Sequence, residues 1–302
     1  MLLKPKTKGF FLALFAALMW GISGACVQFL IQHRSINIEW LVTVRMLIAG
    51  SLLLLLARFS LVLDIFSIWQ RKKDTYALLL FSIFGMLAAQ YTYFAAINAS
   101  NAATATVLQY MGPTVIVCFL AVKLRKIPSL IEMIAVLLTL CGTLLIITHG
   151  SLQTLSISAM GVFWGVLSAV ALAFYTLMPV RLLEDFDSSL VTGWSMVIGG
   201  LAFSFVHAPW KVSGSWDLST YLLTAFIILF ASLLAFYIFM ISVKLIGPTY
   251  TSLLCCTEPL ASTFLAVVWL HVPLTLYDWA GTFMILITIV LLALTQRKAV
   301  TL

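Results

Sequence analysis

The chain consists almost entirely of apolar stretches of about 20 residues, the length of helix that crosses roughly 30 Å of hydrocarbon in a bilayer. Hydrophobic residues make up 63% of the sequence and charged residues only 9%, whereas about 25% of the residues of a soluble domain are charged. We therefore predict an all-α polytopic membrane protein without a soluble domain. Its ten transmembrane helices are predicted at residues 9–30, 38–58, 75–97, 102–122, 129–148, 158–180, 189–208, 219–243, 249–270 and 275–296.

An internal repeat relates these spans to one another. Residues 91–135 align with residues 237–281 at a constant offset of 146, without a gap, and Pro113 falls on Pro259. Each copy holds five spans, an odd number, so the second copy must enter the membrane in the opposite sense. Secondary transporters are commonly built from such inverted repeats, with the site between the halves. The predicted domains are two inverted five-helix repeats, residues 1–150 and residues 151–302.

Positive charge is distributed unevenly across the predicted membrane. If the N-terminus lies inside, the inner segments hold 14 of the 17 lysine and arginine residues. This distribution follows the positive-inside rule and predicts that both termini are cytoplasmic. It also argues against a nucleic-acid-binding face, although the formal net charge is +7. The inner basic residues are Lys4, Lys6, Lys8, Arg58, Arg71, Lys72, Lys73, Lys123, Arg125, Lys126, Arg181, Lys244, Arg297 and Lys298.

Glu258 lies near the middle of the ninth predicted span, directly before Pro259. An ionised carboxylate is costly there, so an acidic residue inside a span suggests a functional site by default. Because the loss of hydration favours the neutral form, Glu258 could bind and release a proton during transport, or it could pair with a cationic substrate. The alternative is a permanently protonated side chain that only bonds to a neighbouring helix. Its repeat mate is Gly112, so this acid breaks the internal symmetry.

Pro113 and Pro259 occupy equivalent positions in the fourth and ninth predicted spans. Each lacks an amide hydrogen and frees the carbonyl four residues earlier, which belongs to Gln109 in one span and to Cys255 in the other. A freed carbonyl at membrane depth is tolerated where it is buried in protein or faces a wet cavity. We therefore predict two hinges that border a central site. A simple bend for packing is the alternative.

Further polar and aromatic side chains lie deep in the predicted spans. Aromatic rings could line a pocket for an amphipathic or cationic ligand, but the same residues could serve packing alone. Arg45, in the second span, could snorkel to the outer interface or form an ion pair inside the bundle. The predicted substrate-binding residues are Trp20, Gln90, Gln109, Tyr175, Tyr237 and Glu258, of which Glu258 is also the predicted proton-coupling residue.

The chain resembles the EamA family of the drug/metabolite transporter superfamily along nearly its whole length. The resemblance rests on the tandem five-span repeat, Trp20–Gly21, Arg45, the segment Asn101–Ala105, Pro113 and Glu258–Pro259. It implies ten helices, a central cavity between inverted halves and a place in the bacterial inner (cytoplasmic) membrane. It also implies export of amino acids or other small metabolites, although some members import. These motifs are structural signatures and say little about the substrate.

These features predict a secondary active transporter that moves a small metabolite, such as an amino acid or related amphipathic compound, outward and in a proton-coupled manner. Its expected partners are that substrate, the lipid bilayer and protons, with the chain as a monomer or homodimer. The alternatives are an importer, or a flippase for a lipid or lipid-linked sugar. An enzyme is not predicted, because it would need clustered acid–base groups and Glu258 has no evident partner beyond Arg45. The four histidines show no metal-ligand spacing, so neither a metal nor a cofactor is expected.

Overall fold

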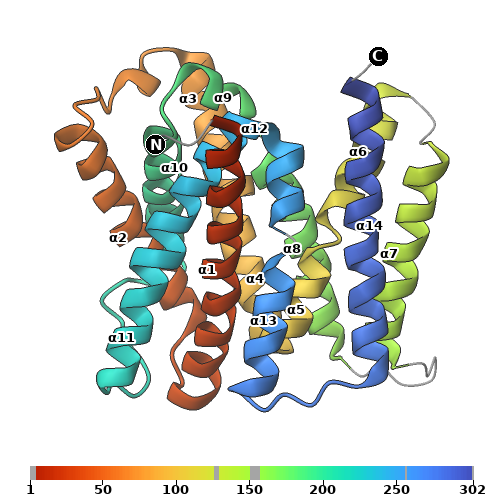
Figure 1. The fold of residues 1–302 in the computed structure, drawn as a ribbon. Coiled ribbons are helices and arrows are strands. Elements are labelled where there is room, and N and C mark those ends of the chain that lie inside the picture. The colour runs from red at the N-terminus through yellow and green to blue at the C-terminus, as the bar shows by residue number, and fades with distance from the viewer. Residues whose placement is uncertain (1–4, 126–128, 150–156, 256, 301–302) are drawn as a thin grey trace.

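In the computed structural model, the described part of the chain forms a bundle of helices (Figure 1). The structure describes residues 5–125, 129–149, 157–255 and 257–300, so the predicted domain junction between residues 150 and 151 lies outside the described residues. The helices of the first half are α1 (Pro5–Arg34), α2 (Ile38–Phe59), η1 (Ser67–Trp69), α3 (Lys72–Leu80), η2 (Phe81–Leu87), α4 (Ala88–Ala99), α5 (Ala102–Gln109), α6 (Gly112–Leu124) and α7 (Leu130–Thr148). Those of the second half are α8 (Ala159–Leu177), α9 (Val180–Asp185), α10 (Ser188–Phe203), α11 (Leu218–Phe226), η3 (Ile227–Leu234), α12 (Ala235–Leu254), α13 (Thr257–Val268) and α14 (Leu276–Val300).

Helices coincide with all ten predicted spans. Within the described ranges, five continuous helical stretches could cross a membrane by length and composition alone, and shorter or interrupted helices account for the other spans. The fourth predicted span is divided into α5 and α6. The ninth begins inside α12, where the chain turns at Gly247 with φ of 82°, and continues as α13. Glycine permits this positive φ because it has no Cβ.

Matched backbone features confirm the repeat. The π-helical segments η2 and η3 begin 146 residues apart, in the third and eighth spans. Arg125 at the end of α6 and His271 after α13 are also 146 residues apart, and both are left-handed, with φ of 52° and 53°. The side chain of Asn37 caps α2, and that of Asp187 caps α10 in the second half. The two halves therefore share their irregularities as well as their helices.

The packing of the helices follows an inverted two-fold pattern. Helix α2 packs against α10 and α7 against α14, so equivalent spans of the two halves meet. Helix α1 packs against α12 and α13, while its equivalent α8 packs against α4, α5 and α6. Figure 1 shows α1 starting at the end of the bundle where α9 follows α8, so α1 and α8 run in opposite directions. The start of α1 and the end of α14 lie at that same end.

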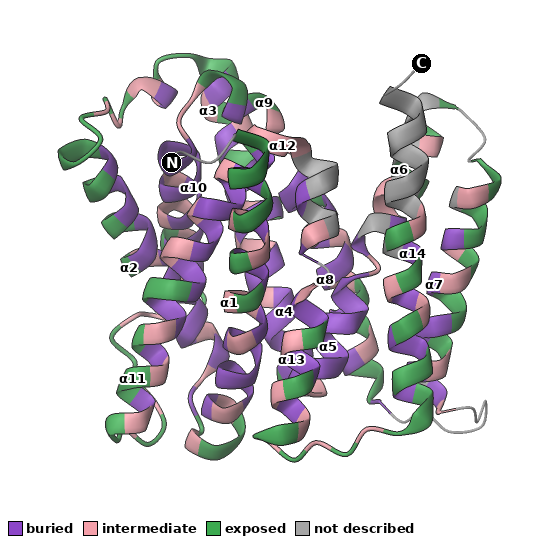
Figure 2. Ribbon diagram, viewed as in Figure 1, coloured by how far each residue is buried: buried purple, intermediate pink, exposed green. Residues whose placement is uncertain are grey.

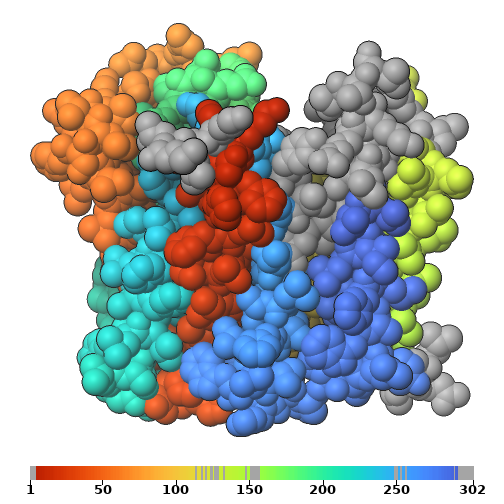
Figure 3. Space-filling view, in the orientation of Figure 1, coloured from red at the N-terminus to blue at the C-terminus, as the bar shows by residue number. Residues whose placement is uncertain are grey.

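The bundle is buried at its centre and apolar on its outside. Buried residues gather along α4, α5 and α8 (Figure 2), and α1 crosses one face between α11 and α13 (Figure 3). Large apolar side chains such as Phe11, Leu55 and Leu144 are exposed on the outer surface, as expected of faces that meet lipid.

Two ion pairs that correspond in the repeat join the halves at opposite ends of the bundle (Figure 1), and the pairs Arg71–Asp185 and His149–Asp278 also cross between the halves. Arg34 lies 2.8 Å from Asp217, and Arg181 lies 3.4 Å from Asp74. In each pair the arginine follows the first span of one half and the aspartate begins the third span of the other. Both pairs are formed at the same time in this structure.

Replacing Asp217 tests how the start of α11 is held. Its carboxylate accepts hydrogen bonds from the Ser219 hydroxyl at 2.7 Å and the Thr220 amide at 2.9 Å. These bonds, that from Ser219 first, lower the pKa of Asp217 below its ordinary value of 3.8. A lowered pKa in the folded state means that the stabilisation is complete above the ordinary value and is lost as the pH falls through the folded-state value.

We therefore expect Asp217→Ala to lower the Tm of the purified protein at neutral pH, because the cap is lost. The difference from the unsubstituted protein should shrink below about pH 4. Thermal unfolding between neutral and acidic pH measures both effects. Asp217→Asn keeps a capping oxygen but loses the charge that pairs with Arg34, so it should lower the Tm by less than Asp217→Ala does. Equal losses in the two variants would contradict the capping role.

Candidate functional site

A cavity at the centre of the bundle lies between the two halves. About 70 Å³ of it is open to the centres of water molecules. About 10–15 Å³ of such space holds one water, so the cavity has room for several waters or a small solute. Its walls come from both repeats, as the resemblance implied. The lining residues are Trp20, Ser23, Arg45, Ala89, Gln90, Tyr93, Phe94, Gln109, Tyr110, Gly112, Ile116, Leu172, Tyr175, Thr176, Phe236, Phe239, Cys255 and Glu258.

Two equivalent helix breaks meet at this cavity. Helix α5 ends at Gln109 and α6 begins at Gly112, while α12 ends at Leu254 and α13 begins at Thr257. The structure therefore shows interrupted helices where the sequence suggested bends in continuous ones. Each proline stands in the first turn after its break, where a helix needs no amide donor. The backbone at Pro113 follows this rule in α6, although its side chain lies outside the described part of the chain.

Tyr110 connects one break to the other. This tyrosine ends α5, and its hydroxyl donates to the carbonyl of Cys255, the carbonyl that Pro259 was predicted to free. That carbonyl also accepts the amide hydrogen of Glu258 at 2.9 Å. The Tyr110 hydroxyl lies 3.1 Å from Oε2 of Glu258 as well. The freed carbonyl is thus satisfied partly from its own helix and partly from the opposite repeat.

The single hydrogen of the Tyr110 hydroxyl links this arrangement to the protonation of Glu258. A phenolic hydroxyl donates one hydrogen bond and accepts others. When it donates to Cys255, its contact with Glu258 is a hydrogen bond only if the carboxyl group carries a proton. When Glu258 is ionised, the same hydrogen is drawn towards the carboxylate. Gain or loss of one proton at Glu258 therefore rearranges the contact between the two breaks.

Arg45 lies inside the cavity wall, where neither sequence-based alternative applies. The side chain is only 3% exposed, so it does not snorkel to the interface. No acidic side chain among the described residues lies within ion-pair distance. Instead, the guanidinium carbon sits 4.5 Å from the ring centre of Phe94 and 5.9 Å from that of Phe236. These aromatic faces attract the cation but leave Nε and Nη1 without a hydrogen-bond partner in the described structure.

Gln90 and Tyr175 leave further polar atoms unsatisfied around the cavity. Both atoms of the Gln90 amide and the Tyr175 hydroxyl are buried and have no hydrogen-bond partner in the described structure. Buried polar groups are almost always paired in native proteins. With Arg45, unpaired polar groups therefore border this cavity from α2, α4 and α8, which indicates a binding site for a polar group.

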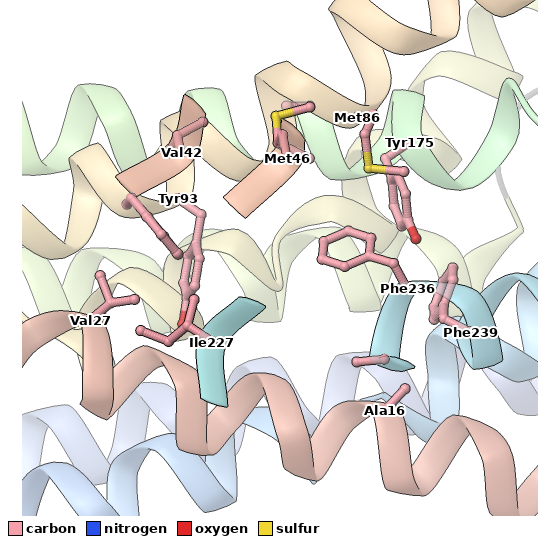
Figure 4. Packing of buried hydrophobic residues seen from close by; sticks show 14 of the residues in the cluster. Ala16, Val27, Val42, Met46, Met86, Tyr93, Tyr175, Ile227, Phe236 and Phe239 are labelled. Carbon is pink, nitrogen blue, oxygen red and sulfur yellow. The ribbon is translucent and has the colours of Figure 1, made fainter. Parts of the chain in front are cut away.

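An aromatic wall faces these polar groups. Tyr175 lies between Phe236 and Phe239, with ring centres 5.6 and 5.4 Å away, and Figure 4 shows its hydroxyl directed towards them. Trp20 packs on the same two phenylalanines, and its indole nitrogen donates to the carbonyl of Ala231 at 3.0 Å. The wall is apolar apart from the Tyr175 hydroxyl, and it suits the nonpolar part of an amphipathic solute.

A buried hydroxyl cluster joins the two repeats beside the cavity. The Tyr93 hydroxyl lies 2.7 Å from Oγ1 of Thr106, which lies 3.2 Å from Oγ of Ser262. Helix α1 packs closely against this cluster at Gly24, since a Cβ on this residue would fall 2.6 Å from the Tyr93 oxygen. These bonds connect α4 and α5 of the first repeat to α13 of the second.

Tyr237 is the predicted site residue that does not line this cavity. It is half-buried on α12, within electrostatic reach of Asp187 at the start of α10. Its repeat mate Tyr91 stands in the same relation to Glu39 at the start of α2, 3.5 Å away. Phe236 and Phe239 of α12 face the cavity, and the residue after Phe236 is turned about 100° around the helix.

Five of the six predicted binding residues do border the cavity, together with several that sequence reasoning missed. Tyr93 could have been found, because it lies three residues after Gln90 on the same helix face. Tyr110 gave a weaker signal, as a polar aromatic residue next to Gln109 and ahead of a proline. The missed lining residues that contribute most to the arguments above are Tyr93, Phe94, Tyr110, Phe236 and Phe239.

Comparison with known proteins gives consistent matches along the chain. The EamA-like transporter family model matches twice, over residues 7–148 and 159–294. A Salmonella typhimurium (strain LT2) protein described as an uncharacterized inner membrane transporter, YicL, is 39% identical over 297 residues, which cover 96% of this chain and 97% of that protein. A solved crystal structure superposes with a TM-score of 0.66 at 17% identity, covering 97% of this chain and 99% of the other. That structural likeness shows the shared fold alone.

Proposed function

Because the chain belongs to the EamA-like transporter family, we propose that it exports a small metabolite, such as an amino acid or related amphipathic compound, in exchange for protons. The observation that carries this proposal is the position of Glu258. It is the one acidic side chain among the described residues that line the cavity, and it stands in the first turn of α13 after a helix break. A carboxyl group there can hold a proton while the cavity faces one side of the membrane and release it on the other.

The two broken spans are where we expect the movement of alternating access. At Pro113 and Pro259 the helices already lack a backbone hydrogen bond, so a change of angle there costs less than in a regular helix. The ion pairs at both ends and the α2–α10 contact hold the remaining framework together. This contrast supports a hinge role for both prolines.

We place the protein in the bacterial inner membrane with both termini in the cytoplasm. The relative from Salmonella typhimurium is described as an inner membrane transporter. The uneven distribution of basic residues supports the orientation. Cysteine labelling from outside intact cells, with single cysteines placed at residues 4 and 213, tests it: the loop cysteine should react and the N-terminal cysteine should not.

Transport by the purified protein in liposomes tests the function itself. Labelled amino acids and amphipathic amines would be supplied singly, with and without an imposed pH gradient. We expect at least one of them to accumulate against its own gradient for one sign of the pH difference, and a protonophore to abolish that accumulation. Protein-free liposomes are the control. Movement of labelled lipid headgroups without movement of any solute would overturn the proposal in favour of a flippase.

Tyr110→Phe should slow proton-coupled transport without unfolding the protein. The variant keeps the ring but removes the hydroxyl that contacts both Cys255 and Glu258. A hydrogen bond of this kind contributes about 0.5–1.5 kcal/mol, so we expect a rate up to about tenfold lower and a changed pH profile. Tyr91→Phe is the matched control, because that hydroxyl contacts Glu39 outside the cavity. Identical pH profiles in the two variants would show that Tyr110 does not act through Glu258.

A further inference from the structure

Arg45 is a buried cation whose partner the described protein does not supply. Buried charges are paired in proteins because burial without a partner is costly. The faces of Phe94 and Phe236 offset part of this cost, but a ring face cannot accept the in-plane hydrogen bonds that a guanidinium group offers. Nε and Nη1 have no hydrogen-bond partner among the described residues. The arrangement is therefore incomplete as it stands.

Gln90, on another helix, is a second buried polar side chain at this cavity whose hydrogen bonds are not made in the described structure. The residue is 3% exposed and lines the same cavity from α4, and the part of the chain that the structure describes offers its amide neither a donor nor an acceptor. Arginine presents parallel N–H groups that match the two oxygens of a carboxylate, and an amide N–H can bond to either oxygen. Among the described residues, Glu258 is the one acid that lines the cavity, and it contacts Tyr110 and forms no ion pair with Arg45.

We propose that Arg45 and Gln90 form a subsite for the carboxylate group of the transported solute. The apolar body of that solute lies on the wall made by Trp20, Tyr175 and Phe239. The unpaired nitrogen atoms are enclosed in the observed conformation, so the guanidinium group turns away from Phe94 when the solute enters. This inference rests on the proposed transport function and narrows its substrates to small carboxylates with a nonpolar body.

Charge supports a carboxylate in preference to a cation. With Glu258 neutral, the cavity wall carries the single positive charge of Arg45, and one carboxylate balances it. An amine would add a second positive charge beside the first. 4-Methylpentanoate meets this requirement as a monoanion. Leucine offers the same carboxylate and nonpolar body but also carries an ammonium group, and leucinamide keeps that ammonium group without the carboxylate.

Ligand-induced stabilisation of the purified full chain tests the subsite. The probes are three acids, leucine, 4-methylpentanoate and benzoate, each compared with its own primary amide at equal concentration. We expect at least one acid to raise the Tm while its amide does not. Sodium chloride and sodium sulfate at the same ionic strength serve as controls. Equal stabilisation by these salts, equal stabilisation by the amides, or no stabilisation by any acid would each overturn the subsite.

Two variants separate the subsite from general stability. Arg45→Gln should weaken acid binding roughly 10- to 100-fold, because hydrogen bonds to a charged group are lost. The variant should fold, since it removes a buried charge that has no counter-ion. Gln90→Met keeps Arg45 and a similar volume, and it should weaken acid binding by a smaller factor. An Arg45→Gln protein that binds the acids within about twofold of the unsubstituted protein, well short of the loss expected for hydrogen bonds to a charged group, would contradict the proposal.

The subsite can fail without the transport function failing. If the liposome assay shows gradient-driven movement of amides or amines, the protein is a transporter and the carboxylate subsite is wrong. If no solute responds to the gradient although the acids stabilise the protein through Arg45, the subsite is correct and the transport proposal is wrong.

Discussion

Glu258→Gln is expected to abolish the accumulation of solute driven by a pH gradient, down to the level of protein-free liposomes. Glutamine has nearly the same shape and can still bond to Tyr110, but it cannot gain or lose a proton. Exchange of labelled for unlabelled solute at equal pH needs no net proton movement and should survive. The measurement compares accumulation and exchange for the same preparation in proteoliposomes.

A matched control distinguishes loss of the proton-exchanging carboxyl group from the loss of an acidic side chain elsewhere in the protein. Glu39→Gln removes an acid from the first turn of α2, outside the cavity, and should leave gradient-driven accumulation intact. The exchange rate of the unsubstituted protein should vary with pH, while that of Glu258→Gln should be flat. A Glu258→Gln protein that still concentrates solute in response to the gradient would refute the coupling role.

The fold could be predicted from the sequence because the starts and ends of its helices are set by nearby residues. The prolines of the fourth and ninth spans fall at the same point of each repeat because a helix can begin there without an amide donor. Thr275 and Asp278 form a capping contact at the start of α14, with the Thr275 amide and hydroxyl each 2.8 Å from the carboxylate. The equivalent contact at Glu132 lies outside the described side chains.

The site was harder to predict because it depends on helix phase. A π-helical segment inserts an extra residue and rotates everything that follows it. Gln90 and Tyr93 follow η2, and Tyr237 lies only three residues after the end of η3. Sequence alignment kept Tyr91 and Tyr237 in register but could not say which way either pointed. Arg45 shows the same limit, since its aromatic neighbours come from helices far away in the chain.

The close packing of α2 against α10 depends on a glycine in each helix. Gly50 and Gly200 are 150 residues apart, the same spacing as the caps of these two helices, and each lies against the other helix. A Cβ on Gly50 would fall 2.8 Å from the Val197 amide nitrogen and 2.9 Å from the Gly193 carbonyl oxygen. Backbone atoms cannot move aside as side chains can, so any added atom must push the helices apart.

We expect Gly50→Ala to cost about 1–3 kcal/mol of stability, the usual range for overpacking a tight core, and Gly50→Leu to prevent recovery of folded protein. Ser51→Leu is the matched control, since Ser51 is the next residue on α2 and is exposed on the outer face. Its larger apolar side chain would meet lipid and should be tolerated. Thermal unfolding and the yield of monodisperse protein measure both effects. If Gly50→Leu and Ser51→Leu gave equal yields and Tm values, the close approach of α2 and α10 would not be what holds the two inverted halves together.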